Sequence, residues 1–145
     1  MQELPVKLLR PNAALPVQAT TGSAGYDVSA CLDSDITIEP GETVAIATGF
    51  AIALELGWAA FIYARSGLGI KHGIIPANCV GVIDSDYRGE IIVGLKNTSG
   101  LPFTVKHGDR IAQMVITKYS LPTPISVESL PETGRGDGGF GSTGR

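Results

Sequence analysis

Cysteine is scarce in this sequence, with only Cys31 and Cys79 among 145 residues. The two stand far apart and show no paired spacing, which excludes both a disulfide framework and a cysteine-based zinc site. We expect both to be buried, reduced thiols of a protein in a reducing compartment.

Charged residues are also few. They make up 17% of the chain, below the roughly 25% of an average soluble domain. The formal net charge of −3 argues against a general nucleic-acid binder, which needs many Lys and Arg contacts to phosphates. Any phosphate site must therefore be locally basic. Because hydrophobic residues reach 43%, we expect some apolar surface to meet other subunits.

No apolar stretch approaches the length needed to span a membrane. The first residues also lack a charged start followed by a long apolar run, as a secretion signal would have. We therefore expect a soluble, cytoplasmic protein without a membrane partner.

Short alternating or β-branched segments are what the sequence does contain. They include Val44 with Ile46, residues 50–54, residues 91–93 and residues 111–116. Turn signals such as Pro40-Gly41, Arg88-Gly89 and residues 107–109 separate them, at spacings expected of sandwiches and barrels. The length favours one domain. We predict an all-β sandwich or barrel with one short helix, from Leu68 to His72.

The composition changes at residue 134, since six of the last twelve residues are glycine. The segment cannot stay ordered alone, so we divide the chain into a domain of residues 1–130 and a flexible arm of residues 131–145. Glycine amides, Arg135 and the hydroxyls of Ser142 and Thr143 suit a polyphosphate. A disordered, tag-like end is an equally good interpretation of the segment alone. Formal matches to a dinucleotide fingerprint and a P-loop precede no helix, and the Arg135-Gly136-Asp137 tripeptide is taken as chance.

Residues 78–90 place two carboxylates and a tyrosine in what resembles a β-hairpin. The segment is either an ordinary Asp/Gly turn or a rigid support for a general base beside an aromatic ring. A calcium loop is excluded, because Arg88 falls at a ligand position and Leu95 stands where the closing glutamate belongs.

Residues 65–69 join a predicted strand to the short helix. Arg65, a serine hydroxyl and amides at a helix start would together form an anion site. The alternative is an ordinary capped connection with Ser66 as the N-cap. His72 and His107 have no partners at metal-ligand spacing, so we assign them no chemistry.

Taken together, the order and spelling of these segments closely resemble the five motifs of the trimeric dUTPase family. The matching segments are residues 24–27, 65–68, 81–89, 108–113 and 135–144. The resemblance implies a jelly-roll-like fold and hydrolysis of dUTP to dUMP and pyrophosphate, which keeps uracil out of DNA and supplies dUMP for dTMP synthesis.

By resemblance, Asp84 activates the water that attacks the α-phosphorus, and Tyr87 packs under the deoxyribose and excludes a 2′-hydroxyl. Uracil lies in a slot too tight for thymine's methyl group, formed mainly by backbone hydrogen bonds of Asn78, Gly81, Val82, Ile83, Asp84 and Ile92.

The resemblance also implies that the phosphates are held by Arg65, Ser66, Gly67 and Gln113. Mg²⁺ is clamped by the three phosphates without a direct protein ligand, with Asp27 and Gln113 near its waters. The arm closes over the substrate through Arg135, Phe140, Gly141, Ser142 and Thr143, and each site is shared between the subunits of a homotrimer.

Two other functions compete with this one. A dCTP deaminase has a similar fold, but the third and fifth motifs match the dUTPase versions. A non-catalytic β-sandwich that binds a nucleotide or a protein could tolerate loss of the base, and the retained Asp84 speaks against it. Departures from the family pattern are small: Ala64, Gly69 and Asp137, the last of which we expect to weaken arm closure modestly.

Overall fold

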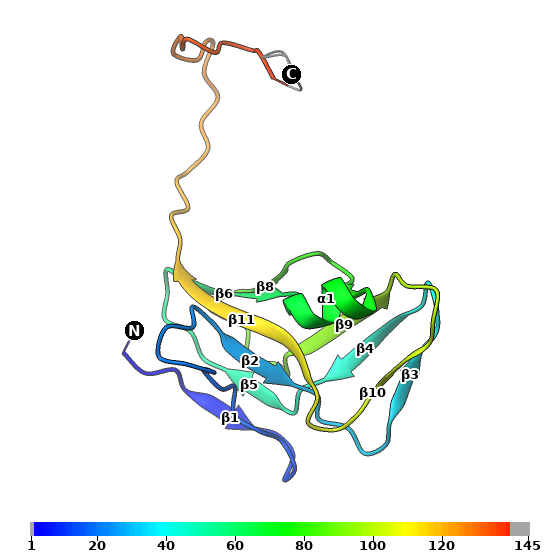
Figure 1. The fold of residues 1–145 in the computed structure, drawn as a ribbon. Helices are drawn as coiled ribbons and strands as arrows, with labels where there is room; N and C mark the ends of the chain where they lie inside the picture. The colour runs from blue at the N-terminus through cyan, green and yellow to red at the C-terminus, as the bar shows by residue number, and fades with distance from the viewer. Residues whose placement is uncertain (1, 140–145) are drawn as a thin grey trace.

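The computed structural model describes residues 2–139, and almost all of its regular structure is β-strand. Figure 1 shows a sandwich of short strands from which the C-terminal segment extends. The elements in chain order are β1 Val6–Leu8, β2 Tyr26–Ser29, β3 Ile36–Ile38, β4 Thr43–Ala47, β5 Phe50–Ile52, β6 Trp58–Tyr63, α1 Ser66–His72, β7 Ile74–Pro76, β8 Gly81–Ile83, β9 Ile92–Asn97, β10 Phe103–Val105 and β11 Arg110–Lys118.

The strands pair in a nested order: β2 with β11, β3 with β10, and β4 with β9, all antiparallel. Nested pairing of distant strands is the arrangement of a jelly roll, in which a long folded hairpin wraps into two sheets. The largest sheet has the order β2-β11-β6-β8 and the next β4-β9-β7, while β1 with β5 and β3 with β10 form two-stranded sheets. The predicted all-β class and the single short helix are confirmed.

Alternation within the strands determines which side chains form the core. In β9 the side chains of Val93, Leu95 and Asn97 are buried while their neighbours are more exposed, as the two-residue period of a strand requires. Val28, Ile46, Met114 and the other buried apolar residues join them in one continuous cluster between the sheets.

Asn97 is the polar member of this core, with its side chain fully buried. Its Nδ2 donates to the carbonyl oxygens of Ile38 at 2.9 Å and Leu101 at 2.7 Å. Its Oδ1 accepts from the backbone N–H of Ser99 at 2.9 Å. One amide thus ties the end of β9 to β3 and to the turn before β10, and it satisfies polar groups that water cannot reach.

Four local expectations need correction or completion. Residues 78–90 do not form the expected β-hairpin, because β8 pairs with β6 whereas β9 pairs with β4 and β7 in another sheet. Cys31 is buried as expected, but Cys79 is exposed, because it occupies a turn in which its φ is 62°. The helix begins at Ser66 rather than Leu68. Within residues 2–139 no helix is long and apolar enough to cross a membrane.

Beyond β11, the chain from residue 119 to residue 139 forms neither helix nor strand and is almost entirely exposed. Figure 1 shows it leaving the sandwich in an extended path. Large apolar side chains are exposed along it, including Leu121, Ile125 and Leu130. Covering such side chains with another surface lowers the free energy of the system.

We predict that Asn97→Ala lowers the free energy of unfolding by about 2–4 kcal/mol, because buried carbonyl groups lose their donor. Urea unfolding at one fixed protein concentration measures it. Thr37→Ala is the control: it removes an exposed hydroxyl contact to Thr104 at 3.1 Å and should change stability by less than about 0.5 kcal/mol. Equal midpoints for the two variants would contradict this role of Asn97.

Candidate functional site

A small pocket opens where the chain turns back between β8 and β9. Its volume is about 180 Å³, and it is lined by Val82, Ile83, Asp84, Tyr87, Glu90, Ile91 and Ile92. Five of these residues were predicted from the sequence to contact one ligand. The structure brings those five together within one chain.

Asp84 follows directly after β8 and is exposed. Its backbone carbonyl accepts the N–H of Tyr87 at 3.2 Å, which closes a tight turn. Within residues 2–139 no hydrogen bond or ion pair engages its carboxylate. The carboxylate is therefore held in place by its backbone and is free to accept a proton from a water molecule in the pocket.

Tyr87 is fixed at both the ring and the hydroxyl. Its Oη donates to the carbonyl oxygen of Glu90 at 3.0 Å. A Cβ on Gly89 would lie 2.6 Å from Cζ of this ring, so only glycine lets the ring lie across the backbone there. The ring, 45% exposed, forms one wall of the pocket.

The other end of β8 is packed just as closely. Gly81 is buried, and a Cβ at this position would meet Cβ of Ile62 at 3.2 Å and Nδ2 of Asn78 at 3.4 Å. The amide of Asn78 therefore lies directly over Gly81. The left-handed turn at Cys79 brings this amide next to the strand that forms the pocket floor.

A second group of predicted residues surrounds Asp27, whose side chain is only 7% exposed. Its Oδ1 accepts from Nε of Arg65 at 3.0 Å, and its Oδ2 accepts from Nη1 of Arg110, also at 3.0 Å. Arg65 also donates to the carbonyl oxygen of Arg110 at 3.1 Å. Gln113 lies opposite Asp27 and Tyr63 in the β2-β11-β6 sheet. This side of the site is basic, as a phosphate site must be in an acidic protein.

These two groups lie at opposite ends of β6. Ile83, which precedes Asp84, is paired with Ala60, while Gln113 is paired with Tyr63. From Ala60 to Arg65 the extended chain covers about 16 Å at about 3.3 Å per residue. The pocket beside Asp84 and the basic group around Asp27 are therefore separate regions within one chain.

At the start of α1, Arg65 is the N-cap residue, its backbone is extended, and no side chain caps the helix. The alternative in which Ser66 is the N-cap is wrong, because Ser66 is already helical. Ser66 and Gly67 are both exposed, so the hydroxyl can reach a ligand.

Both histidines have structural contacts. Nδ1 of His107 accepts the N–H of Leu32 at 3.2 Å, and the His72 ring lies 5.3 Å from the Phe103 ring, between centroids. Neither lies in the pocket or beside Asp27.

In the arm, Arg135 is exposed, and its carbonyl accepts the N–H of Gly138 at 3.1 Å in a turn. Phe140, Gly141, Ser142 and Thr143 lie outside the described residues. The part of the arm that is described extends away from the sandwich (Figure 1).

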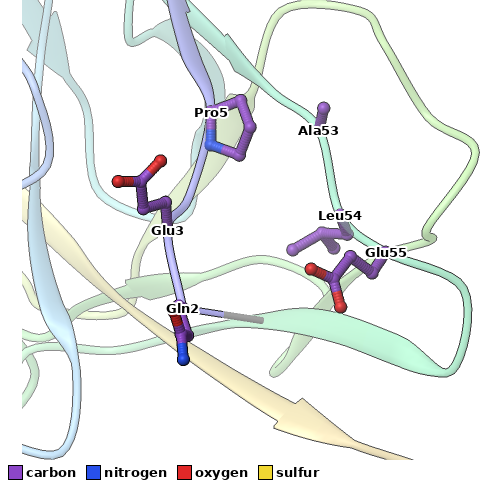
Figure 2. A pocket seen from close by; sticks show the side chains of 6 residues that line it. All are labelled: Gln2, Glu3, Pro5, Ala53, Leu54 and Glu55. Atoms are coloured by element: carbon purple, nitrogen blue, oxygen red, sulfur yellow. The ribbon is translucent and has the colours of Figure 1, made fainter.

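A wider concavity, of about 610 Å³, lies elsewhere, between the start of the chain and the segment after β5. Figure 2 shows its lining side chains, Gln2, Glu3, Pro5, Ala53, Leu54 and Glu55. Among the described residues, two carboxylates and no cationic side chain line it, which makes it unsuitable for a polyphosphate. Size alone therefore does not identify the nucleotide site.

Three residues of the site were missed from the sequence: Glu90, Ile91 and Arg110. Glu90 follows the turn at residues 84–87, and its closeness to Asp84 and Tyr87 in the sequence was the one signal that could have indicated a place in the pocket. The pairing of Arg110 with Asp27 joins residues far apart in the chain, and only the β2-β11 register reveals it.

Comparison with known proteins places these features in a family. The dUTPase family model matches residues 11–144. A deoxyuridine 5'-triphosphate nucleotidohydrolase of Desulfitobacterium hafniense is 56% identical over 131 residues, covering 90% of this chain and 87% of the relative. The corresponding protein of Neisseria meningitidis is 51% identical over 145 residues, covering 98% and 97%.

Solved structures agree. The dUTPase of Staphylococcus bacteriophage 80alpha with dUPNHPP matches with a TM-score of 0.91 and 27% identity, over 100% of both chains. A variant dUTPase from phage phi11 of S. aureus, described for its coordination of a structural Mg(II) ion, matches with a TM-score of 0.80 and 26% identity, over 88% of this chain and 98% of the other. Sequence, fold and the order of the motif residues thus lead to one conclusion, that this chain belongs to the dUTPase family.

Proposed function

We propose that this protein hydrolyses dUTP to dUMP and pyrophosphate. The observation that carries the proposal is the small pocket lined by both Asp84 and Tyr87. Among residues 2–139 nothing pairs with the Asp84 carboxylate, and the Tyr87 hydroxyl is held by Glu90. The chain belongs to the dUTPase family. The relatives named above act on deoxyuridine 5'-triphosphate, and the phage enzyme holds an imido analogue of that nucleotide.

In this proposal uracil lies against β8, with Asn78 and the backbone of residues 81–83 on one side and Ile92 on the other. The close packing of Gly81 against Ile62 and Asn78 keeps the strand from moving outward. A rigid slot rejects a larger base by fit, which is how thymine would be excluded. The Tyr87 ring, lying under the sugar, would reject a ribose in the same way.

For the chemical step, Asp84 would act as the general base. Its carboxylate takes a proton from water as the oxygen attacks the α-phosphorus, and pyrophosphate leaves with the electron pair of the bond that breaks. A base fixed by its own turn supplies the orientation that this attack requires.

The phosphate chain would be held by Arg65, Ser66, Gly67 and Gln113. Both oxygens of Asp27 already accept hydrogen bonds from arginines, so we assign Asp27 to positioning Arg65 and to waters around Mg²⁺ rather than to direct ligation, with Gln113 also near those waters. Bound magnesium would neutralise the phosphate charge and fix the geometry of the triphosphate.

The distance along β6 supports a site shared between subunits. Asp84 and Arg65 lie toward opposite ends of that strand, so we infer that one nucleotide meets Asp84 of one copy and Arg65 of another. The exposed apolar side chains of residues 119–130 supply surface that a neighbouring copy would cover. We therefore propose the homotrimer, without stable binding of nucleic acid.

We also keep the division into a catalytic domain of residues 1–130 and an arm of residues 131–145. The arm would close with Arg135, Ser142 and Thr143 on the phosphates, with Gly141 allowing close approach, and with Phe140 over the base. Closure would exclude bulk water from the reacting centre. Two free thiols fit the cytoplasmic location that we propose.

We predict that the intact protein with Mg²⁺ releases pyrophosphate from dUTP far faster than from dTTP, dCTP or UTP. Asp84→Asn keeps the shape of the pocket but removes the base, so its kcat should fall about 10²–10⁴-fold. Chelation by EDTA should abolish activity, and added Mg²⁺ should restore it. A folded protein that leaves dUTP uncut would favour a binding module, and ammonia release from dCTP would indicate a deaminase.

The shared site predicts complementation between inactive variants. Chains carrying Asp84→Asn and chains carrying Arg65→Ala, unfolded together and refolded as a mixture, should regain activity. Random mixing in a ring leaves about a quarter of the sites intact. The control mixture combines Asp84→Asn with Tyr87→Ala, which damage the same pocket. It should regain no activity. Equal activity in the two mixtures would contradict a shared site.

Deleting residues 131–145 should lower kcat/KM for dUTP by about 100-fold, as expected when donors to the transition state are lost. The sandwich should remain folded, because no described residue of the arm is buried in its core. Steady-state kinetics and the circular dichroism spectrum of the truncated chain measure the two effects. Full activity without the arm would contradict the closing role.

A further inference from the structure

Glu90 and Ile91, which precede β9, are hydrogen-bonded to the turn between β4 and β5. The N–H of Gly49 donates to Oε1 of Glu90 at 2.8 Å. Oγ1 of Thr48 donates to the carbonyl of Ile91 at 2.6 Å, and the N–H of Ile91 donates to the carbonyl of Phe50 at 2.9 Å. Of these three bonds, only the one to Glu90 depends on a side chain that also lines the pocket.

The donor of that bond, the N–H of Gly49, lies in closely packed surroundings. Gly49 is buried with a φ of 74°, and a Cβ there would lie 2.6 Å from Cβ of Ala13 and 2.7 Å from Sγ of Cys31. Its carbonyl also accepts the N–H of Leu9 at 2.7 Å. Since only glycine fits this backbone conformation, the N–H of Gly49 is a fixed point to which Glu90 attaches.

The main chain of Glu90 in turn holds the tyrosine. Its carbonyl accepts the hydroxyl of Tyr87, and Gly89 between them has no side chain to displace the ring. The side chain of Glu90 therefore anchors the same residue whose backbone fixes Tyr87. A contact from Arg10 to Glu90 at 3.9 Å is partly exposed and adds little to this anchor.

From these contacts we propose that Glu90 is a positioning residue: by binding Gly49 it fixes the Tyr87 ring, and so it sets the preference of the pocket for deoxyribose over ribose. This inference rests on the proposed function, in which Tyr87 lies under the sugar. Asp84 stands after β8, and β6 holds that strand independently. Loss of the anchor should therefore loosen sugar selection more than it slows the chemical step.

The test compares Glu90→Ala with Glu90→Gln. The amide oxygen of glutamine can still accept the N–H of Gly49, whereas alanine cannot. We expect Glu90→Ala to lower the ratio of kcat/KM for dUTP to that for UTP by about tenfold, since exclusion by fit depends on rigid walls. KM for dUTP should rise while kcat is largely kept. Glu90→Gln should stay close to the intact protein.

Three further variants separate the anchor from general effects. Glu42→Ala removes an equivalent bond, from the N–H of Glu39 to the Glu42 carboxylate at 2.8 Å, far from the pocket, and should leave the ratio unchanged. Arg10→Gln removes the ion pair to Glu90, together with a hydrogen bond from Nη1 of Arg10 to the carbonyl of Cys31 at 3.4 Å, and should also leave the ratio unchanged. Tyr87→Phe removes the hydroxyl bond to Glu90 without touching the anchor, and should lower the ratio in the same direction even if Glu90→Ala does not fold.

Binding is measured in parallel, with the imido analogues of dUTP and UTP. A lower ratio in Glu90→Ala or Tyr87→Phe, with Glu90→Gln near the intact protein, supports the proposal. Unchanged ratios in Glu90→Ala and Tyr87→Phe, or an equal loss in Glu90→Gln and Glu90→Ala, would overturn it. An intact chain that leaves dUTP uncut would contradict the proposed function itself, and the ratio of analogue affinities would then decide the role of Glu90 separately.

Discussion

The antiparallel register of β6 with its two neighbours is the constraint on which the rest of this structure depends. On one side β6 pairs with β8, and on the other it pairs with β11. The first pairing places Asp84 at one end of the strand, and the second places Gln113 and Asp27 toward the other. Because a shift of one residue would turn every side chain to the opposite face, the buried core that fixes the register also fixes where each half of the site can lie.

Each half has its own means of rigidity. In the loop between β8 and β9, hydrogen bonds to the backbone and glycines without room for a side chain hold the pocket walls. The nearly buried carboxylate of Asp27 accepts charge-assisted hydrogen bonds from the guanidinium groups of Arg65 and Arg110. The first solution suits selection of an uncharged base and sugar by shape. The second suits a charged phosphate chain, because Arg65 is oriented before the ligand arrives and loses less conformational entropy on binding.

Much of the fold could be predicted from the sequence, because β-branched alternation and turn dipeptides are local signals. The strands at residues 43–47, 50–52 and 110–118 lie where the pattern predicted them. The burial of Cys79 was predicted wrongly, since the left-handed turn that exposes it follows from the position of β8 and not from its neighbours in sequence. Five residues predicted from the motifs line one pocket, and their roles stay predictions. The pairing of Arg110 with Asp27 was not predicted, because it depends on strands distant in the chain.

The anchor at Glu90 shows why a family motif alone is an incomplete description of such a site. A motif names the residues expected to touch a ligand, and in the function we propose these include Asp84 and Tyr87. We attribute the rigidity of Tyr87 to Glu90 and, through it, to Gly49. Ala13 and Cys31 leave no space for a side chain at Gly49. Selectivity by shape requires walls that do not yield. We therefore expect the stiffness of the proposed sugar wall to depend on residues of the core and the N-terminal segment, outside the motif.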